Sequence, residues 1–169
     1  MTTRYTTLES PLGTLLLVGE KSAGAPGGVA LVSLSMEGQK GAAAVRPGWV
    51  RDDAAFAYAA GQLDAYFGGG LTEFELEFVP SGSQFQRDVW GALEAIPYGT
   101  TLTYGQIADR IGAPRSASRS VGTAIGANPL LVVRPCHRVI GANGSLTGYA
   151  GGLERKQTLL AIEGSVLAG

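Results

Sequence analysis

The sequence predicts a chain of two parts, an α/β domain over residues 1–79 and a mostly helical domain over residues 80–169. Short apolar runs of strand length lie in the first part, at residues 15–18 and 29–34. Apolar residues at helical spacing dominate the second part. The pattern changes in residues 79–83, which contain Pro80 and Gly82 and are typical of a linker.

The first part is expected to form a small antiparallel sheet plus one helix. Asp52 or Asp53 can cap this helix, which ends at the glycine run of residues 68–70. Its apolar positions include Phe56, Leu63 and Phe67. Residues 74–78 alternate strictly between apolar and acidic side chains, which predicts a half-buried strand.

The second part contains a predicted helix-turn-helix. A first helix precedes it, with apolar residues at Phe85, Val89, Leu93 and Ile96, and residues 97–99 end it. Thr103 can cap a short helix over residues 104–111, and Ser116 can cap another that ends near residue 126. The tight turn of residues 112–115 joins these two helices. Residues 130–133 are strand-like, and residues 153–162 predict the last helix.

One cysteine and one histidine are neighbours in this chain, Cys136 and His137, within Arg-Pro-Cys-His-Arg-Val-Ile. A lone cysteine is more often a small buried residue than a nucleophile. Pro135 before the pair and Gly141 after it favour a shaped turn that presents a side chain. A thiol next to a base or a positive charge becomes a better nucleophile, because its pKa falls.

Composition excludes several classes of protein. One cysteine and one histidine cannot supply the roughly four ligands of a structural zinc site, and we expect neither a metal nor another cofactor. No apolar run approaches the roughly 20 residues of a membrane span, so we expect no membrane partner and a cytoplasmic location. The net charge is −1. Residues 1–83 carry five basic and nine acidic side chains (−4), and residues 84–169 carry eight and five (+3), so a phosphate-facing surface is expected in the second part.

The second part resembles the O6-alkylguanine-DNA alkyltransferases. The resemblance rests on Pro-Cys-His-Arg-Val at residues 135–139, on the preceding helix-turn-helix and Asn128-Pro129, and on Tyr-Ala-Gly-Gly-Leu at residues 149–153. It covers residues 84–164, about half of the chain. It implies a winged-helix-like second domain and a first domain that is ribonuclease-H-like in outline. It further implies a monomer that repairs double-stranded DNA carrying O6-alkylguanine, and possible activity on O4-alkylthymine is left open.

The resemblance also implies catalytic roles. Cys136 would take the alkyl group irreversibly, in a single turnover, as a methylated-DNA–[protein]-cysteine S-methyltransferase. His137 would accept the thiol proton through a water, and Glu163 would orient the imidazole. Tyr104 would donate to guanine N3, and Asn128 would brace the turn.

Further implied residues bind the base and the DNA. Val139 would contact the guanine amine, Tyr149 and Ala150 would face the base, and Lys156 would shape their loop. Arg119 would fill the gap left by a flipped base, on a helix surface shared with Thr103, Ser116, Ala117 and Gly122. Arg138 is expected to pair locally.

Arg134 is a departure, because relatives usually have an aliphatic residue before the proline. Its charge allows three roles: contact with a phosphate, pairing with an acidic neighbour, or lowering the Cys136 pKa. It could equally disturb the packing. The sequence leaves these alternatives open.

Three other functions compete with alkyl transfer. A lesion-binding protein without transfer would not need Cys136. A cysteine hydrolase would leave the helix-turn-helix unexplained, and its Cys–His pair usually comes from separate elements. A sequence-specific DNA-binding regulator is disfavoured by the neutral net charge.

Overall fold

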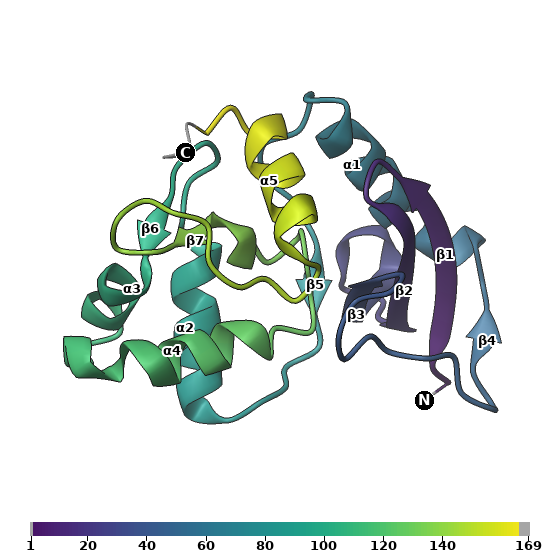
Figure 1. Cartoon of the computed structure of the whole chain (residues 1–169). Helices are drawn as coiled ribbons and strands as arrows, with labels where there is room; N and C mark the ends of the chain where they lie inside the picture. The colour runs from purple at the N-terminus through teal and green to yellow at the C-terminus, as the bar shows by residue number, and fades with distance from the viewer. Residues whose placement is uncertain (1, 166–169) are drawn as a thin grey trace. The chain divides into compact units, whose positions relative to one another are not determined.

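The structure is a computed structural model that describes residues 2–165. It divides into two compact units, one that ends at Pro80 and one that begins at Ser81 (Figure 1). The first unit is an α/β unit and the second is mostly helical, so the predicted fold class is confirmed. Within residues 2–165, no helix combines the length and the apolar character that a membrane crossing requires.

The first unit is built on a five-stranded mixed sheet in the order β4-β1-β2-β3-β5. The three long strands, β1 (Arg4–Ser10), β2 (Gly13–Lys21) and β3 (Val29–Met36), are antiparallel as expected. The two short edge strands, β4 (Val50–Arg51) and β5 (Glu77–Phe78), add parallel pairings that the sequence did not predict.

Helix α1 (Ala57–Phe67) supplies the rest of this unit's core. A 3₁₀ turn (Ala54–Phe56) leads into it, and the Asp52 carboxylate accepts the backbone N–H of Ala55 at 3.1 Å. Asp52 therefore caps this entry, whereas Asp53 makes no side-chain cap. Phe56 and Leu63 are buried together with the apolar residues of β2 and β3.

The predicted strand over residues 74–78 is wrong for its first three residues. Phe74 packs against Tyr66 of α1, with ring centroids 5.2 Å apart. The Gln62 side chain accepts from the backbone N–H of Glu75 at 3.0 Å and donates to its carbonyl at 3.4 Å. Since this side chain satisfies backbone groups that a neighbouring strand would otherwise pair, only Glu77 and Phe78 join the sheet.

The second unit contains α2 (Gln84–Glu94), α3 (Tyr104–Arg110), α4 (Ser118–Gly126) and α5 (Leu153–Ile162), with a two-stranded parallel sheet of β6 (Leu102–Thr103) and β7 (Val139–Ile140). Helix α4 packs against α2 and α3 (Figure 1). The Trp90 indole of α2 donates to the Ala124 carbonyl of α4 at 2.9 Å. Val89, Leu93 and Ile96 are buried as predicted, but Phe85, in the first turn of α2, is 37% exposed.

The helix-turn-helix is present as α3 and α4, with one wrong cap. The Thr103 hydroxyl accepts from the backbone N–H of Gln106 at 3.2 Å, and the Thr103 backbone N–H donates to the Gln106 side chain at 2.8 Å. The predicted cap of α3 is therefore confirmed. Ser116 does not cap α4. It lies inside a 3₁₀ turn (Arg115–Ala117), and α4 begins after Ala117 without a side-chain cap.

Residues 130–133 form a buried turn, and the strand-like prediction for them is wrong. The backbone N–H of Arg134 reaches the carbonyl of Leu130 at 3.0 Å, and that of Val133 reaches Leu131 at 2.8 Å. These bonds close the chain on itself and leave Val132 at φ 69°, the single positive φ of a non-glycine residue within residues 2–165. A β-branched residue there is strained, so the surroundings must hold this turn.

Candidate active site and nucleic-acid interface

Cys136 begins a 3₁₀ turn (Cys136–Arg138) that leads directly into β7. Pro135 has φ −78° and ψ 62°, and the Cys136 backbone N–H donates to the Arg134 carbonyl at 2.7 Å. This is the geometry of an inverse γ-turn, which proline favours through its fixed φ. The thiol therefore lies at a sharp turn, as the sequence predicted, and Cys136 is only 3% exposed.

Asn128 holds the strained turn that precedes the cysteine. Its side-chain amide donates to the carbonyls of Leu130 at 3.3 Å and Arg134 at 3.0 Å, and its Oδ1 accepts the Leu130 N–H at 3.0 Å. Asn128 is buried. One side chain thus hydrogen-bonds both ends of the turn.

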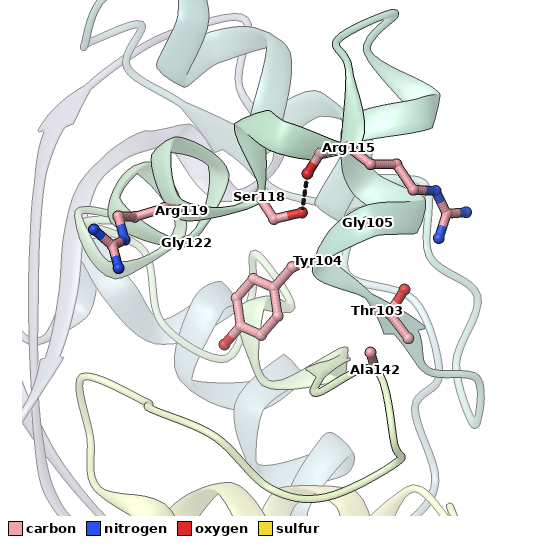
Figure 2. Close-up of a pocket in the computed structure, with 8 residues that line it drawn as sticks. All are labelled: Thr103, Tyr104, Gly105, Arg115, Ser118, Arg119, Gly122 and Ala142. Atoms are coloured by element: carbon pink, nitrogen blue, oxygen red, sulfur yellow. Dashed lines mark hydrogen bonds between the residues drawn. The ribbon is translucent and has the colours of Figure 1, made fainter.

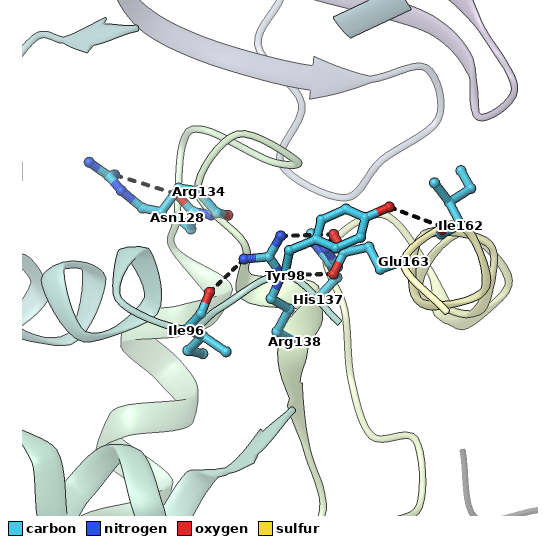
Figure 3. A network of polar contacts seen from close by, with 8 residues as sticks. All are labelled: Ile96, Tyr98, Asn128, Arg134, His137, Arg138, Ile162 and Glu163. Atoms are coloured by element: carbon cyan, nitrogen blue, oxygen red, sulfur yellow. Dashed lines mark hydrogen bonds and ion pairs between the residues drawn. The ribbon is translucent and has the colours of Figure 1, made fainter. Parts of the chain in front are cut away.

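His137 contacts Glu163, a residue 26 positions away in the sequence. Nε2 of His137 lies 2.7 Å from Oε2 of Glu163, and both side chains are fully buried (Figure 3). A carboxylate can only accept, so Nε2 carries the hydrogen and Nδ1 keeps a lone pair. Nδ1 has no hydrogen-bond partner among the described residues. The imidazole therefore keeps a basic nitrogen that Glu163 does not occupy.

Arg138 also binds Glu163, so the expectation of local pairing is wrong. Its Nε and Nη2 donate to the two carboxylate oxygens at 2.7 and 3.0 Å, and its Nη1 donates to the carbonyl of Ile96 at 2.6 Å. The Tyr98 ring lies under the guanidinium at 5.7 Å. This bidentate pair keeps Glu163 ionised in a buried position and ties the cysteine turn to the end of α5.

Burial controls the protonation states of Cys136 and His137. It raises the pKa of the Cys136 thiol to about 11, although the Asn128 hydrogen bond and the charges of Lys156 and Arg134 all lower it. Burial also lowers the pKa of His137, against the raising effect of Glu163. The resting pair at neutral pH is therefore a thiol beside a neutral imidazole, a nucleophile that needs its base.

Lys156 is a buried cation that joins the cysteine strand to the following loop. Its Nζ donates to the carbonyls of Val139 at 2.5 Å, Thr147 at 3.3 Å and Gly148 at 3.4 Å. Burial lowers its pKa to about 8. These three bonds fix the approach to Tyr149, and they use one lone pair of the Val139 carbonyl.

Thr147 was not predicted as a site residue, yet its hydroxyl lies 2.9 Å from the phenol oxygen of Tyr104. In this geometry the threonine donates, which leaves the phenol hydrogen able to donate elsewhere. No sequence motif indicates this contact, because it joins a loop residue to a helix 43 positions away. It can be seen only once α3 and the loop are folded.

A pocket of about 520 Å³ opens over the helix-turn-helix (Figure 2). Four predicted residues line it: Thr103, Tyr104, Arg119 and Gly122. Four residues that were not predicted also line it: Gly105, Arg115, Ser118 and Ala142. Ser116 and Ala117 lie in the 3₁₀ turn before α4 and do not line it, nor do Cys136, Tyr149 and Ala150.

The two arginines of this pocket differ in their contacts. Arg115 pairs with Asp109 at 2.6 Å, and it points to the opposite side of the pocket from Arg119 in Figure 2.

Within residues 2–165, no cluster of three or more His, Cys, Asp or Glu residues is arranged to hold a metal ion.

Comparison with known proteins places both units in one family. Residues 84–165 match the model of the 6-O-methylguanine DNA methyltransferase DNA binding domain, and residues 3–80 match that of its ribonuclease-like domain. The chain is 54% identical to the methylated-DNA–protein-cysteine methyltransferase of Mycolicibacterium paratuberculosis, over 94% of this chain and 91% of the relative. The chain is 48% identical to the methylated-DNA–protein-cysteine methyltransferase of Methanosarcina acetivorans, over 95% of this chain and 98% of the relative.

Solved structures agree with the sequence comparison. The crystal structure of Mycobacterium tuberculosis OGT in complex with DNA superposes with a TM-score of 0.86 at 49% identity, covering 95% of this chain and 93% of that one. Similarity of this extent in both sequence and fold covers the cysteine turn, the helix-turn-helix and the first unit together. The chain belongs to the 6-O-methylguanine DNA methyltransferase family.

Proposed function

We propose that this protein repairs double-stranded DNA by transferring the alkyl group of O6-alkylguanine irreversibly to its own Cys136. The observation that carries the proposal is the buried Cys136 next to an imidazole whose Nε2 is fixed by Glu163 at 2.7 Å. The second domain, residues 80–169, holds both this site and the helix-turn-helix. Transfer needs a reduced thiol, which fits a reducing compartment such as the cytoplasm. We expect the protein to act as a monomer.

The reaction forms one bond and breaks one. Sγ of Cys136 attacks the alkyl carbon, and the carbon–O6 bond breaks with its electron pair going to O6. The thiol proton passes to Nδ1 of His137 through a water, and His137 gives a proton back through water as the restored guanine takes one up at N1. Since Cys136 ends as a thioether with no group to displace the alkyl, each molecule acts once.

The flipped guanine is held by the loop and strand around the cysteine. Tyr149 and the backbone N–H of Ala150 face the base and its O6. The carbonyls of Cys136 and Val139 accept from the exocyclic amine, the Val139 carbonyl through the lone pair that Lys156 leaves open. The base must leave the stack, because its alkyl carbon cannot be reached in the duplex.

The pocket over α3 and α4 receives the DNA. Arg119 enters the gap left by the base, and the short side chains of Ser116, Ala117 and Gly122 allow the helix to approach the minor groove. The backbone of Thr103 begins α3 at the edge of this surface. Binding relies on phosphates and is therefore weak in sequence preference and sensitive to salt.

Replacing Arg119 with alanine should slow repair of a duplex by about 10- to 100-fold, because the unstacked base then costs a few kcal/mol with nothing in its place. Reaction with the free base O6-methylguanine should change little. Single-turnover rates on both substrates measure this difference. Arg46→Ala removes an exposed charge from the first unit and should leave both rates unchanged. Equal slowing of both substrates by Arg119→Ala would remove Arg119 from base flipping.

Tyr104 donates to guanine N3, and Thr147 orients its phenol. Tyr104→Phe and Thr147→Val should each slow transfer by about 3- to 10-fold, the effect of one hydrogen bond. The double variant should be no slower than Tyr104→Phe alone, because both changes remove the same interaction. Thr147→Ser keeps the hydroxyl and should retain the rate. Additive effects of the two changes would show that Thr147 acts independently of Tyr104.

Stoichiometry tests the proposed function. With O6-methylguanine duplex in excess, the number of methyl groups removed should rise to one per protein molecule and stop. Continued removal would indicate a hydrolase. Tight binding of the lesion with no removal would indicate a lesion-binding protein without transfer.

A further inference from the structure

Arg134 is a buried cation immediately before the cysteine turn. Its side chain is 10% exposed, and its Nε lies 3.8 Å from Oε1 of Glu94, a residue of α2. Its guanidinium carbon lies 4.8 Å from the ring centre of Trp90, also on α2. One face of the guanidinium therefore stacks on an aromatic ring while an edge meets a carboxylate, an arrangement that lysine cannot reproduce.

The platform under Arg134 is fixed. Trp90 is 4% exposed, and its indole N–H donates to Ala124 of α4 at 2.9 Å. Because this ring cannot move without breaking a buried hydrogen bond, it holds the guanidinium in one place. The contacts also decide between the roles left open by the sequence. The head group faces α2 and is covered, so it is not presented to a phosphate, and it packs without displacing Trp90.

Arg134 is linked to Cys136 by two routes. Its backbone carbonyl accepts the Cys136 N–H at 2.7 Å. Its Nη1 also lies 3.4 Å from Oδ1 of Asn128 (Figure 3), and the Asn128 amide donates to that same Arg134 carbonyl at 3.0 Å. The amide of Asn128 thus contacts both the guanidinium of Arg134 and the carbonyl that accepts the Cys136 N–H. Figure 3 shows Asn128 and Arg134 apart from the cluster of Arg138 and Glu163.

We propose that Arg134, held between Trp90 and Glu94, is a positioning residue that keeps a buried positive charge beside Cys136 and thereby favours its thiolate during alkyl transfer. This inference rests on the proposed function and concerns the same thiol. Glu94 acts as the counter-charge that moderates the effect, because its carboxylate offsets part of the field that reaches the sulfur.

Other groups act on the same sulfur. Lys156 of α5 also lowers the Cys136 pKa, as does the Asn128 hydrogen bond, while burial raises it. On the other side of the turn, His137 is neutral, and the charges of Arg138 and Glu163 neutralise each other. Burial lowers the pKa of Arg134 itself, and Glu94 raises it. An arginine stays protonated throughout the working range, so its charge is permanent.

Arg134 and Glu94 carry opposite charges, so removing each of them should change the reaction rate of Cys136 in opposite directions. Arg134→Met removes the positive charge, raises the thiol pKa and should slow reaction at pH 8 by about 3- to 10-fold. Glu94→Gln leaves Arg134 uncompensated, lowers the thiol pKa and should speed the reaction by a smaller factor. Arg134→Lys keeps the charge but not the contacts with Trp90 and Glu94, so its rate should lie between those of wild type and Arg134→Met.

Two reactions are followed by intact-protein mass between pH 6 and 10: methyl transfer from O6-methylguanine duplex, and alkylation by iodoacetamide, which needs no DNA. Cys136 is the single cysteine in the sequence, so any added mass of the reagent is assigned by comparison with Cys136→Ser. The order Glu94→Gln, wild type, Arg134→Met in both reactions supports the inference. If wild type transfers no methyl but this order holds with iodoacetamide, the proposed function fails and Arg134 keeps its role.

Two results would overturn the inference. Slowing by both Arg134→Met and Glu94→Gln would mean that the ion pair is only a structural clamp. A weaker salt dependence of DNA binding in Arg134→Met would mean that Arg134 contacts a phosphate. Glu94 has a side chain that is 40% exposed, so we expect Glu94→Gln to fold. Its rate shows whether removing the counter-charge speeds or slows Cys136, even if Arg134→Met does not fold.

Discussion

Replacing Cys136 with serine should abolish methyl transfer and leave DNA binding unchanged. A serine hydroxyl is far less acidic than a thiol and a far weaker nucleophile toward a saturated alkyl carbon. The change of sulfur to oxygen hardly alters the buried volume, so the turn and the helix-turn-helix should remain intact. The measurement is the amount of O6-methylguanine left in a duplex after incubation with excess protein.

The control for this variant is its affinity for the same duplex at a fixed salt concentration. We expect Cys136→Ser to bind the duplex with wild-type affinity and to leave all of the O6-methylguanine in place. Loss of the lesion in the presence of Cys136→Ser would place the nucleophile elsewhere in the chain.

Replacing Glu163 with glutamine should lower both the stability of the protein and the rate of transfer. Glu163 is 5% exposed and binds His137 and Arg138 together. Without its charge, Arg138 is left buried and unpaired, which costs about 3–5 kcal/mol in the free energy of unfolding. The amide can also donate to Nε2, which favours the wrong imidazole tautomer and should slow transfer by about 10²- to 10⁴-fold. Chemical denaturation and single-turnover rates measure the two effects.

Glu154→Gln is the matched control, since it makes the same change at an exposed position in the first turn of α5. It should change stability by only a few tenths of a kcal/mol and leave the rate unchanged. A similar free energy of unfolding for both variants would show that the buried Glu163–Arg138 pair does not stabilise the fold. A normal rate in Glu163→Gln would remove it from the orientation of His137.

Local chemistry explains which parts of the fold were predictable. Thr103 and Gln106 form a capping box within four residues, so the start of α3 could be recognised in the sequence. Residues 130–133 could not, because an apolar run is compatible with a strand until the side chain of Asn128 takes up the backbone groups that a strand would use. Residues 74–76 were misassigned for the same kind of reason, through Gln62.

Some contacts of the candidate site can likewise be predicted from the sequence, and others cannot. The Cys136–His137 pair is adjacent in sequence and was recognised directly, and the resemblance supplied Glu163. The partners of Arg138 and Tyr104 lie 25 and 43 positions away, and no spacing rule connects them. Arg134 departs from the usual aliphatic residue, which the sequence shows directly. Its proposed role depends on Trp90 and Glu94, which only the folded chain brings to it.

The central claim, direct transfer to Cys136, is tested by the mass of the intact protein after reaction with duplex DNA containing O6-methylguanine. The account predicts a gain of one methyl group per molecule, mapped by peptide analysis to the segment that contains Cys136. A protein that binds this duplex and keeps its original mass, or that gains the methyl on another residue, would contradict it.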